Sequence, residues 1–134
     1  MPTPVICVSA AVIVDDDGRV LVVRKRGTTT FMQPGGKADP GETPLSALLR
    51  ELHEELGVTV SAAQTRPLGR HVAAAANEPG HVVDAELFLV TLYDQPRACA
   101  EIDEMRWVDL TAPGDVDLAP LTSGVVRQLL HSAV

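Results

Sequence analysis

Residues 36–58 read GKADPGETPLSALLRELHEELGV, and the rest of the chain is interpreted outward from this stretch. Thr43 has a side chain suited to capping a helix N-terminus, and Pro44 suits the first helical position. Gly57 suits the position just after a helix, where the backbone takes a left-handed conformation. The stretch therefore predicts a glycine-containing loop followed by a helix over residues 44–56.

The predicted helix has an apolar face and an acidic face. At about 100° per residue, five leucines fall within an arc of about 100° and should face a core. These are Leu45, Leu48, Leu49, Leu52 and Leu56. On the same count Glu54, Glu51 and Glu55 lie at about −60°, 0° and 40°, so they form a carboxylate arc beside the leucines.

The carboxylate arc is unfavourable for an isolated helix. Like charges at i, i+3 and i+4 weaken a helix by roughly 0.2–0.5 kcal/mol per pair, and the helix dipole disfavours negative charge in the C-terminal half. A hard divalent cation would remove both penalties, and all-oxygen ligation indicates Mg²⁺ or Mn²⁺ rather than zinc. The alternative is a solvated acidic face with Arg50 as an ionic partner.

The remaining sequence is rich in predicted strands. Two β-branched runs, 5–14 and 19–25, are joined by Asp15-Asp16-Asp17-Gly18 and predict a hairpin. Further extended segments are expected at 31–33, 58–60, 68–76, 81–93 and 105–108, and a second helix over 120–131. Without regular alternation of strands and helices, this order predicts an α+β mixed-sheet sandwich. Because no linker or repeat divides the chain, we expect a single domain over residues 1–134.

Composition and charge exclude some functions. With 11 Lys and Arg against 18 Asp and Glu, the net charge is −7, which disfavours binding a nucleic-acid polymer through a basic surface. A small phosphorylated ligand remains compatible, because a bound divalent metal reverses the local field. Two cysteines are too few for a disulfide scaffold, and the apolar run 5–14 is too short for a membrane span and lacks a signal-peptide start. We therefore expect a cytoplasmic protein without a membrane segment.

A spaced set of identities runs through the opening stretch. It comprises Gly36, Glu42, Arg50, Glu51, Glu54, Glu55 and Gly57, with aliphatic Leu52 and Val58. The spacing is that of the Nudix box, Gly-x5-Glu-x7-Arg-Glu-U-x-Glu-Glu-x-Gly-U, where U is aliphatic. The sequence thus resembles Nudix hydrolases, most of all the small MutT-type pyrophosphohydrolases. The resemblance implies an α/β/α sandwich, with a mixed sheet between helices, that hydrolyses the diphosphate linkage of a nucleoside diphosphate derivative. A (d)NTP-type substrate would give NMP and pyrophosphate.

The resemblance also implies a set of metal ligands. The expected ligands are the Gly35 carbonyl and the carboxylates of Glu51, Glu54, Glu55 and Glu101. Glu101 is included because many family members add a carboxylate from a later loop. Glu104 is the alternative, and either residue can instead be a solvated loop acid.

Catalytic roles follow from the same resemblance. Glu51, Glu54, Glu55 and Glu101 would act through the metal, and Glu51 is also the candidate base for the attacking water. Arg50 and Glu42 are expected to hold the loop and helix in register. Metals suit this chemistry because they neutralise phosphate oxygens and lower the pKa of bound water.

Five residues are candidates for contact with the substrate. Lys37 matches a family position that can touch a phosphate or the leaving group. Arg24 and Arg26 share one face of a strand and could contact phosphates, or could only blunt an edge strand with charge. Phe31 is the better candidate for stacking on a base. Asn77 could read a base or sugar, although Asn-Glu-Pro-Gly is also common turn chemistry.

Two functions from different classes fit this inventory. The first is a metal-dependent hydrolase acting on a small nucleotide. The second is a non-catalytic nucleotide sensor with the same fold that regulates a partner. The complete set of acids favours the enzyme, and the sequence leaves monomer and homodimer equally open.

Overall fold

The computed structural model describes residues 3–132. Its strands are β1 (Val5–Ile13), β2 (Val20–Lys25), β3 (Gly35–Gly36), β4 (Thr65–Ala74), β5 (Val82–Val90) and β6 (Ile102–Val108). Its helical segments are α1 (Pro44–Leu56), the 3₁₀ turn η1 (Ala62–Gln64), the π-helix η2 (Leu121–Val126) and α2 (Arg127–Ser132). None of the helices within residues 3–132 is long and apolar enough to cross a membrane.

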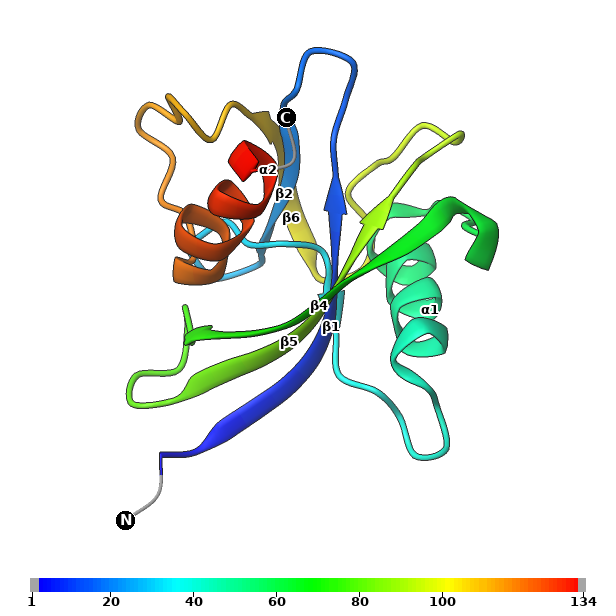
Figure 1. The fold of residues 1–134 in the computed structure, drawn as a ribbon, viewed down its shortest axis with the longest axis horizontal. Helices are drawn as coiled ribbons and strands as arrows, with labels where there is room; N and C mark the ends of the chain where they lie inside the picture. Colours follow the sequence, from blue (N-terminus) through cyan, green and yellow to red (C-terminus); the bar gives the residue numbers. More distant parts are fainter. Residues whose placement is uncertain (1–2, 133–134) are drawn as a thin grey trace.

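The strands form two sheets between helical layers. One sheet has the order β3-β1-β5-β4, with β1 parallel to β5 and the other neighbours antiparallel. The second sheet pairs β2 with β6 antiparallel. Figure 1 shows α1 on one side of the strands and η2 with α2 on the other. The predicted α+β fold, a mixed sheet between helices, is confirmed.

The predicted hairpin of the first two strands is wrong in its pairing. The predicted turn at residues 15–18 does form, and it is closed by a hydrogen bond that the Asp15 N–H donates to the Arg19 carbonyl at 2.9 Å. Beyond it only one bridge, between Val14 and Val20, joins the two arms. The strands then separate, β1 to pair with β5 and β2 to pair with β6. Residues 58–60 are also not a strand, although Val58 and Val60 are buried.

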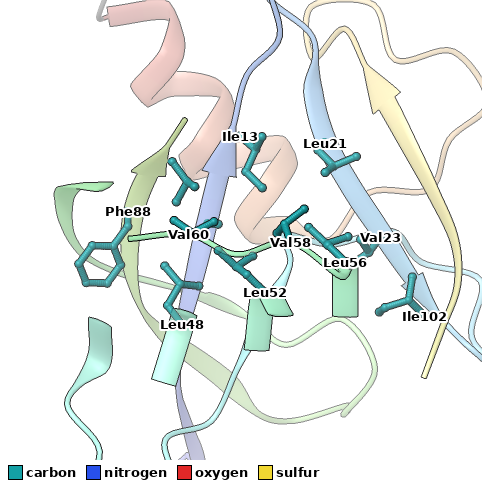
Figure 2. Close-up of a cluster of buried hydrophobic side chains, with 12 residues drawn as sticks. Ile13, Leu21, Val23, Leu48, Leu52, Leu56, Val58, Val60, Phe88 and Ile102 are labelled. Atoms are coloured by element: carbon teal, nitrogen blue, oxygen red, sulfur yellow. The ribbon is translucent and has the colours of Figure 1, made fainter. Parts of the chain in front are cut away.

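Both faces of the central strands are buried, so the molecule has two apolar clusters. Ala11 and Ile13 of β1 lie in the cluster under α1, whereas Ala10 and Val12 lie in the cluster under η2 and α2. Figure 2 shows the first cluster, where leucines of α1 meet side chains of β1, β2 and β5. Its labelled members are Ile13, Leu21, Val23, Leu48, Leu52, Leu56, Val58, Val60, Phe88 and Ile102. Alternation along a strand explains the division, since successive side chains point to opposite faces.

The predicted C-terminal helix forms, but its first part is a π-helix. Its Thr122 is fully buried and donates through Oγ1 to the Gln33 side-chain oxygen at 2.9 Å. Gln33 in turn donates through Nε2 to the Ala11 carbonyl at 2.9 Å. This buried chain of hydrogen bonds fixes the segment before the glycine loop to β1 and to η2.

Candidate active site

Helix α1 begins and ends where its caps predict. The Thr43 hydroxyl accepts a hydrogen bond from the Ser46 N–H at 3.1 Å, and Pro44 occupies the first turn. Gly57 follows the helix with φ +67°, and its N–H donates to the His53 carbonyl at 3.0 Å. Because both ends are fixed, the rotational positions of the helix carboxylates are fixed as well.

The two glycines of β3 bring the loop against the helix. The Gly35 N–H donates to the Glu55 carboxylate at 3.0 Å. Gly35 has φ +148°, and a Cβ there would collide with the Ser9 carbonyl oxygen. A Cβ on Gly36 would lie 2.6 Å from the carboxyl carbon of Glu51. The backbone therefore leaves no room for a side chain at Gly35, whereas a side chain at Gly36 would displace the Glu51 carboxylate.

Arg50 connects the acids of the loop and helix. Its guanidinium makes a bidentate pair with Glu42, with both N···O distances 2.8 Å. Its Nη1 donates to Glu51 at 2.9 Å and lies 3.4 Å from Glu54, and its Nη2 donates to the Lys37 carbonyl at 3.1 Å. The Arg50 hydrogen bonds and the Asp39 N–H lower the pKa of Glu42 to about 2. The expected positioning role of Arg50 and Glu42 is consistent with these contacts.

Glu55 is the one buried carboxylate of the site. Only 6% of its surface is exposed, and desolvation raises its pKa to about 7. The Gly35 N–H and the Lys25 charge oppose this rise, whereas the Glu51 and Glu101 carboxylates add to it. A bound cation would favour the ionised form of this carboxyl group and so oppose the rise in its pKa.

A cleft of about 640 Å³ collects most of the predicted site residues. The predicted metal ligands all line it: Gly35, Glu51, Glu54, Glu55 and Glu101. Lys37 and Asn77 also line it. A smaller cavity of about 120 Å³ shares residues with the cleft, among them Val8, Met32 and Gly36. It continues to Leu121 and Thr122 of η2, so the cleft leads into a mainly apolar recess.

Three predicted substrate contacts do not line the cleft. Arg24 donates to the Thr28 carbonyl and to Asp103, both at 2.9 Å. Phe31 is 5% exposed and packs in the cluster under η2, so it cannot stack on a base in the cleft. Arg26 lies nearer to the cleft, because its Nη2 is 3.4 Å from the carbonyl of Ala100, which lines the cleft. Arg26 itself is not among the lining residues.

Glu104, the alternative to Glu101, lies outside the cleft. It accepts hydrogen bonds from Arg106 at 2.6 Å and from Arg24 at 3.3 Å. These two cations lower the pKa of Glu104. Of the two loop acids, the structure brings only Glu101 to the helix carboxylates.

Sequence reasoning missed Lys25. This residue lines both the cleft and the smaller cavity, and its charge acts on Glu55. With Arg24 and Arg26 as candidates on one face of the strand, alternation places Lys25 on the opposite face, away from the expected substrate contacts. A usable signal was present, because Lys25 continues the alternation of Leu21 and Val23, which face α1. The register also shifts between Arg24 and Lys25 at the end of β2.

The site residues fit a hard divalent cation in chemistry. Their donors are carboxylate oxygens and one carbonyl, the ligands that Mg²⁺ and Mn²⁺ prefer. Within residues 3–132, no three acidic, histidine or cysteine side chains converge closely enough to hold a metal ion. Arg50 forms ion pairs with two of these acids, Glu51 and Glu54. In this arrangement the arginine neutralises the acids that a cation would neutralise.

Comparison with known proteins identifies the family. The NUDIX domain profile matches residues 4–129. An 8-oxo-dGTP diphosphatase of Haemophilus influenzae is 27% identical over 98% of this chain and 96% of its own length. An RNA pyrophosphohydrolase of Halorhodospira halophila is 47% identical over 47 residues, which are 35% of this chain but only 26% of that protein.

Solved structures share the fold along the whole chain. A nudix hydrolase family member from Chromobacterium violaceum, described as putative, has a TM-score of 0.73 and 27% identity over 98% of this chain and 80% of its own. The MutT protein from Methanosarcina mazei has a TM-score of 0.75 and 21% identity over 99% of this chain and 97% of its own. The chain therefore belongs to the NUDIX domain family and is a Nudix hydrolase.

Proposed function

We propose that this hydrolase cleaves the diphosphate linkage of a small nucleotide. The proposed substrate is of the (d)NTP type, and the products are NMP and pyrophosphate. The observation that carries the proposal is the cleft that Glu51, Glu54, Glu55 and Glu101 line together with Lys25 and Lys37. The full-length similarity to an 8-oxo-dGTP diphosphatase supports a nucleoside triphosphate substrate.

The recess next to the cleft supports a nucleoside as part of the substrate. Its walls include Val8, Met32 and Leu121, which offer apolar contact to a flat base. Thr122 and Gln33, whose side chains are hydrogen-bonded to each other, also line the recess. With the base in this recess, the phosphates would extend past Lys25 towards the carboxylates.

The carboxylates and the Gly35 carbonyl would hold Mg²⁺ or Mn²⁺. When bound, such an ion neutralises phosphate oxygens and lowers the pKa of a water ligand. Lys25 and Lys37 would donate to phosphate oxygens and orient the chain of phosphates. Glu51 would accept the proton of the attacking water as its oxygen bonds to phosphorus. The bridging P–O bond then breaks, and its electron pair stays on the oxygen of the departing NMP or pyrophosphate.

Product analysis with a nucleotide panel tests this function. Wild-type protein is incubated with (d)NTPs, 8-oxo-dGTP, nucleoside diphosphate sugars and dinucleoside polyphosphates, each with MgCl₂ or with EDTA. We expect NMP and pyrophosphate from at least one triphosphate in MgCl₂ and none in EDTA. Nucleotide binding without turnover of any compound would instead support the non-catalytic sensor.

Two glutamine variants assign the activity to the cleft. Glu55→Gln should lower kcat by about a hundredfold or more, because it removes a metal ligand worth several kcal/mol in the transition state. Glu104→Gln is the matched change outside the cleft and should leave the activity near that of wild type. Equal losses in both variants would contradict the assignment.

We also propose that residues 1–134 form one domain, that the enzyme is cytoplasmic, and that it works as a monomer or a homodimer. The NUDIX match over residues 4–129 supports one domain. Limited proteolysis, cell fractionation and light scattering test these three statements in turn.

A further inference from the structure

The residue before Glu101 has an unusual backbone conformation. Ala100 is the only non-glycine residue within 3–132 that has a positive φ, at +52°. The Ile102 N–H donates to the Cys99 carbonyl at 3.0 Å, so a turn spans 99–102 with Ala100 at its second position. Glycine normally takes such a position, because a Cβ there crowds a neighbouring carbonyl oxygen. The turn is therefore held in a conformation that the side chain of Ala100 disfavours.

One set of contacts fastens this turn to the end of α1. The Cys99 N–H donates to the Glu55 carbonyl at 2.9 Å, and the Arg97 N–H donates to the Leu56 carbonyl at 3.0 Å. Both carbonyls belong to the last turn of the helix, whose carbonyls have no partner within the helix. Cys99, the first residue of the turn, thus caps Glu55 itself, and Arg97, two residues before the turn, caps Leu56.

A second set of contacts fastens the turn to the end of β2. The Arg26 N–H donates to the Glu101 carbonyl at 2.9 Å, and Arg26 Nη2 lies 3.4 Å from the Ala100 carbonyl. The backbone on both sides of the Ala100–Glu101 peptide is therefore held. Such support from neighbouring structure is what allows a disfavoured conformation to persist.

We propose that Ala100 is a positioning residue for Glu101: the clamped turn at 99–102 holds the Glu101 carboxylate in the cleft with the carboxylates of α1. Both Ala100 and Glu101 line the cleft, and β6 begins at the next residue. A turn of another type would rotate the peptide between them and change the direction of the Glu101 side chain. This inference rests on the proposed hydrolysis and on a role for Glu101 in it.

Substitution of Ala100 tests the proposal. Valine disfavours a positive φ because its Cβ is branched, so Ala100→Val should lower kcat about tenfold with little change in KM. Ala98→Val is the matched control, because Ala98 is exposed in the same segment, has no positive φ and does not line the cleft. This control should keep the wild-type kcat.

A double-mutant cycle shows whether the effect passes through Glu101. Glu101→Gln alone should lower kcat more than it raises KM. In that background Ala100→Val should produce no further loss of kcat. A loss as large as in the wild-type background, or a silent Glu101→Gln, would overturn the proposal, as would equal losses from Ala100→Val and Ala98→Val.

Thermal melting in EDTA provides a readout that does not need catalysis. Ala100→Gly should melt above wild type, because glycine adopts the positive φ without crowding, while its kcat falls less than that of Ala100→Val. A lower Tm for Ala100→Gly would contradict a strained turn. Absence of hydrolysis by the wild type in every assay would instead refute the proposed function, and the melting result would be unaffected.

Discussion

Glu55 combines burial with a role expected for a charged group. Burial raises its pKa to about 7 from an ordinary value of 4.5. A raised pKa in the folded state contributes stability that is fully present below pH 4.5 or so and is lost as pH rises through about 7. Ionised Glu55 therefore lowers the stability of the folded protein most at neutral and alkaline pH, where a bound cation would stabilise the site most.

The pH dependence of melting in EDTA tests this reading of Glu55. Glu55→Gln resembles the protonated carboxyl, so it should melt above wild type. The difference in Tm should grow between about pH 4.5 and 7 and stay level above that range. For Glu104→Gln the difference in Tm from wild type should not grow over the same pH range, because neighbouring arginines lower the pKa of Glu104. A constant difference for Glu55→Gln at all pH values would contradict a raised pKa.

Lys25 is the second residue whose environment predicts a measurable effect. It lines the cleft and the recess, where phosphates of the substrate would pass. A hydrogen bond to a charged group contributes roughly 1.5–3 kcal/mol, so Lys25→Gln should raise KM about tenfold or more. Lys25→Arg should retain most of the affinity, because the positive charge remains.

Arg24→Gln is the control for Lys25, one residue away. Arg24 pairs with Asp103 and Glu104 rather than facing the cleft. Steady-state kinetics should therefore show an unchanged KM for Arg24→Gln. If both variants raise KM equally, general loss of positive charge explains the effect and Lys25 has no special position.

At the scale of elements, Arg50 joins the glycine loop to α1 through Glu42. The bidentate pair lowers the pKa of Glu42 to about 2 from 4.5. A lowered pKa contributes stability that is present above about pH 4.5 and lost as pH falls towards 2. Wild type should therefore be more stable than Glu42→Gln near pH 6, and the gap should close between about pH 4.5 and 2.

Urea unfolding at several pH values measures that gap. Asp39→Asn is a useful comparison, because the Asp39 carboxylate lies 3.4 Å from Arg50 but is 68% exposed. Its effect should be smaller at every pH, since exposed ion pairs contribute little. A gap for Glu42→Gln that persists unchanged at pH 2 would show that the pair does not depend on the Glu42 charge.

Local signals in the sequence were sufficient for α1 and its neighbours. Thr43 and Gly57 define its ends through interactions with residues at most four positions away. The acidic arc then follows from helical geometry alone. Hence Glu51, Glu54 and Glu55 could be placed together without knowledge of the rest of the fold.

Pairing between distant strands could not be read in the same way. Asp15 and Gly18 indicate a turn correctly, yet a turn does not choose the partners of the strands that it joins. β1 pairs with β5, more than seventy residues later, and β2 pairs with β6. The burial of Phe31 and the outward partners of Arg24 depend on these later segments, so their absence from the cleft could not be foreseen.

At the scale of the whole molecule, two apolar clusters hold the helical layers on opposite faces of the strands. The cleft is assembled from segments far apart in sequence: the end of β2, the β3 loop, α1, residues 75–78 and the turn before β6. Sequence similarity over residues 4–129 and structural similarity over almost the whole chain agree with this architecture. The cleft that the carboxylates line is thus built from several segments and not from one helix alone.

The net charge of −7 makes one control essential for any metal effect. Added salt screens repulsion among surface charges and can raise stability without a specific site. A cation that binds the folded cleft, by contrast, stabilises in proportion to its affinity for that cleft. The two effects differ in their dependence on Glu51 and Glu55.

The most direct test of the central claim is the melting temperature during titration with MgCl₂, compared with NaCl of equal ionic strength. We predict a saturable rise in Tm with MgCl₂ that exceeds the rise with NaCl and shrinks in the Glu51→Gln/Glu55→Gln double variant. Equal shifts with the two salts, in wild type and double variant alike, would contradict a divalent-cation site at these carboxylates.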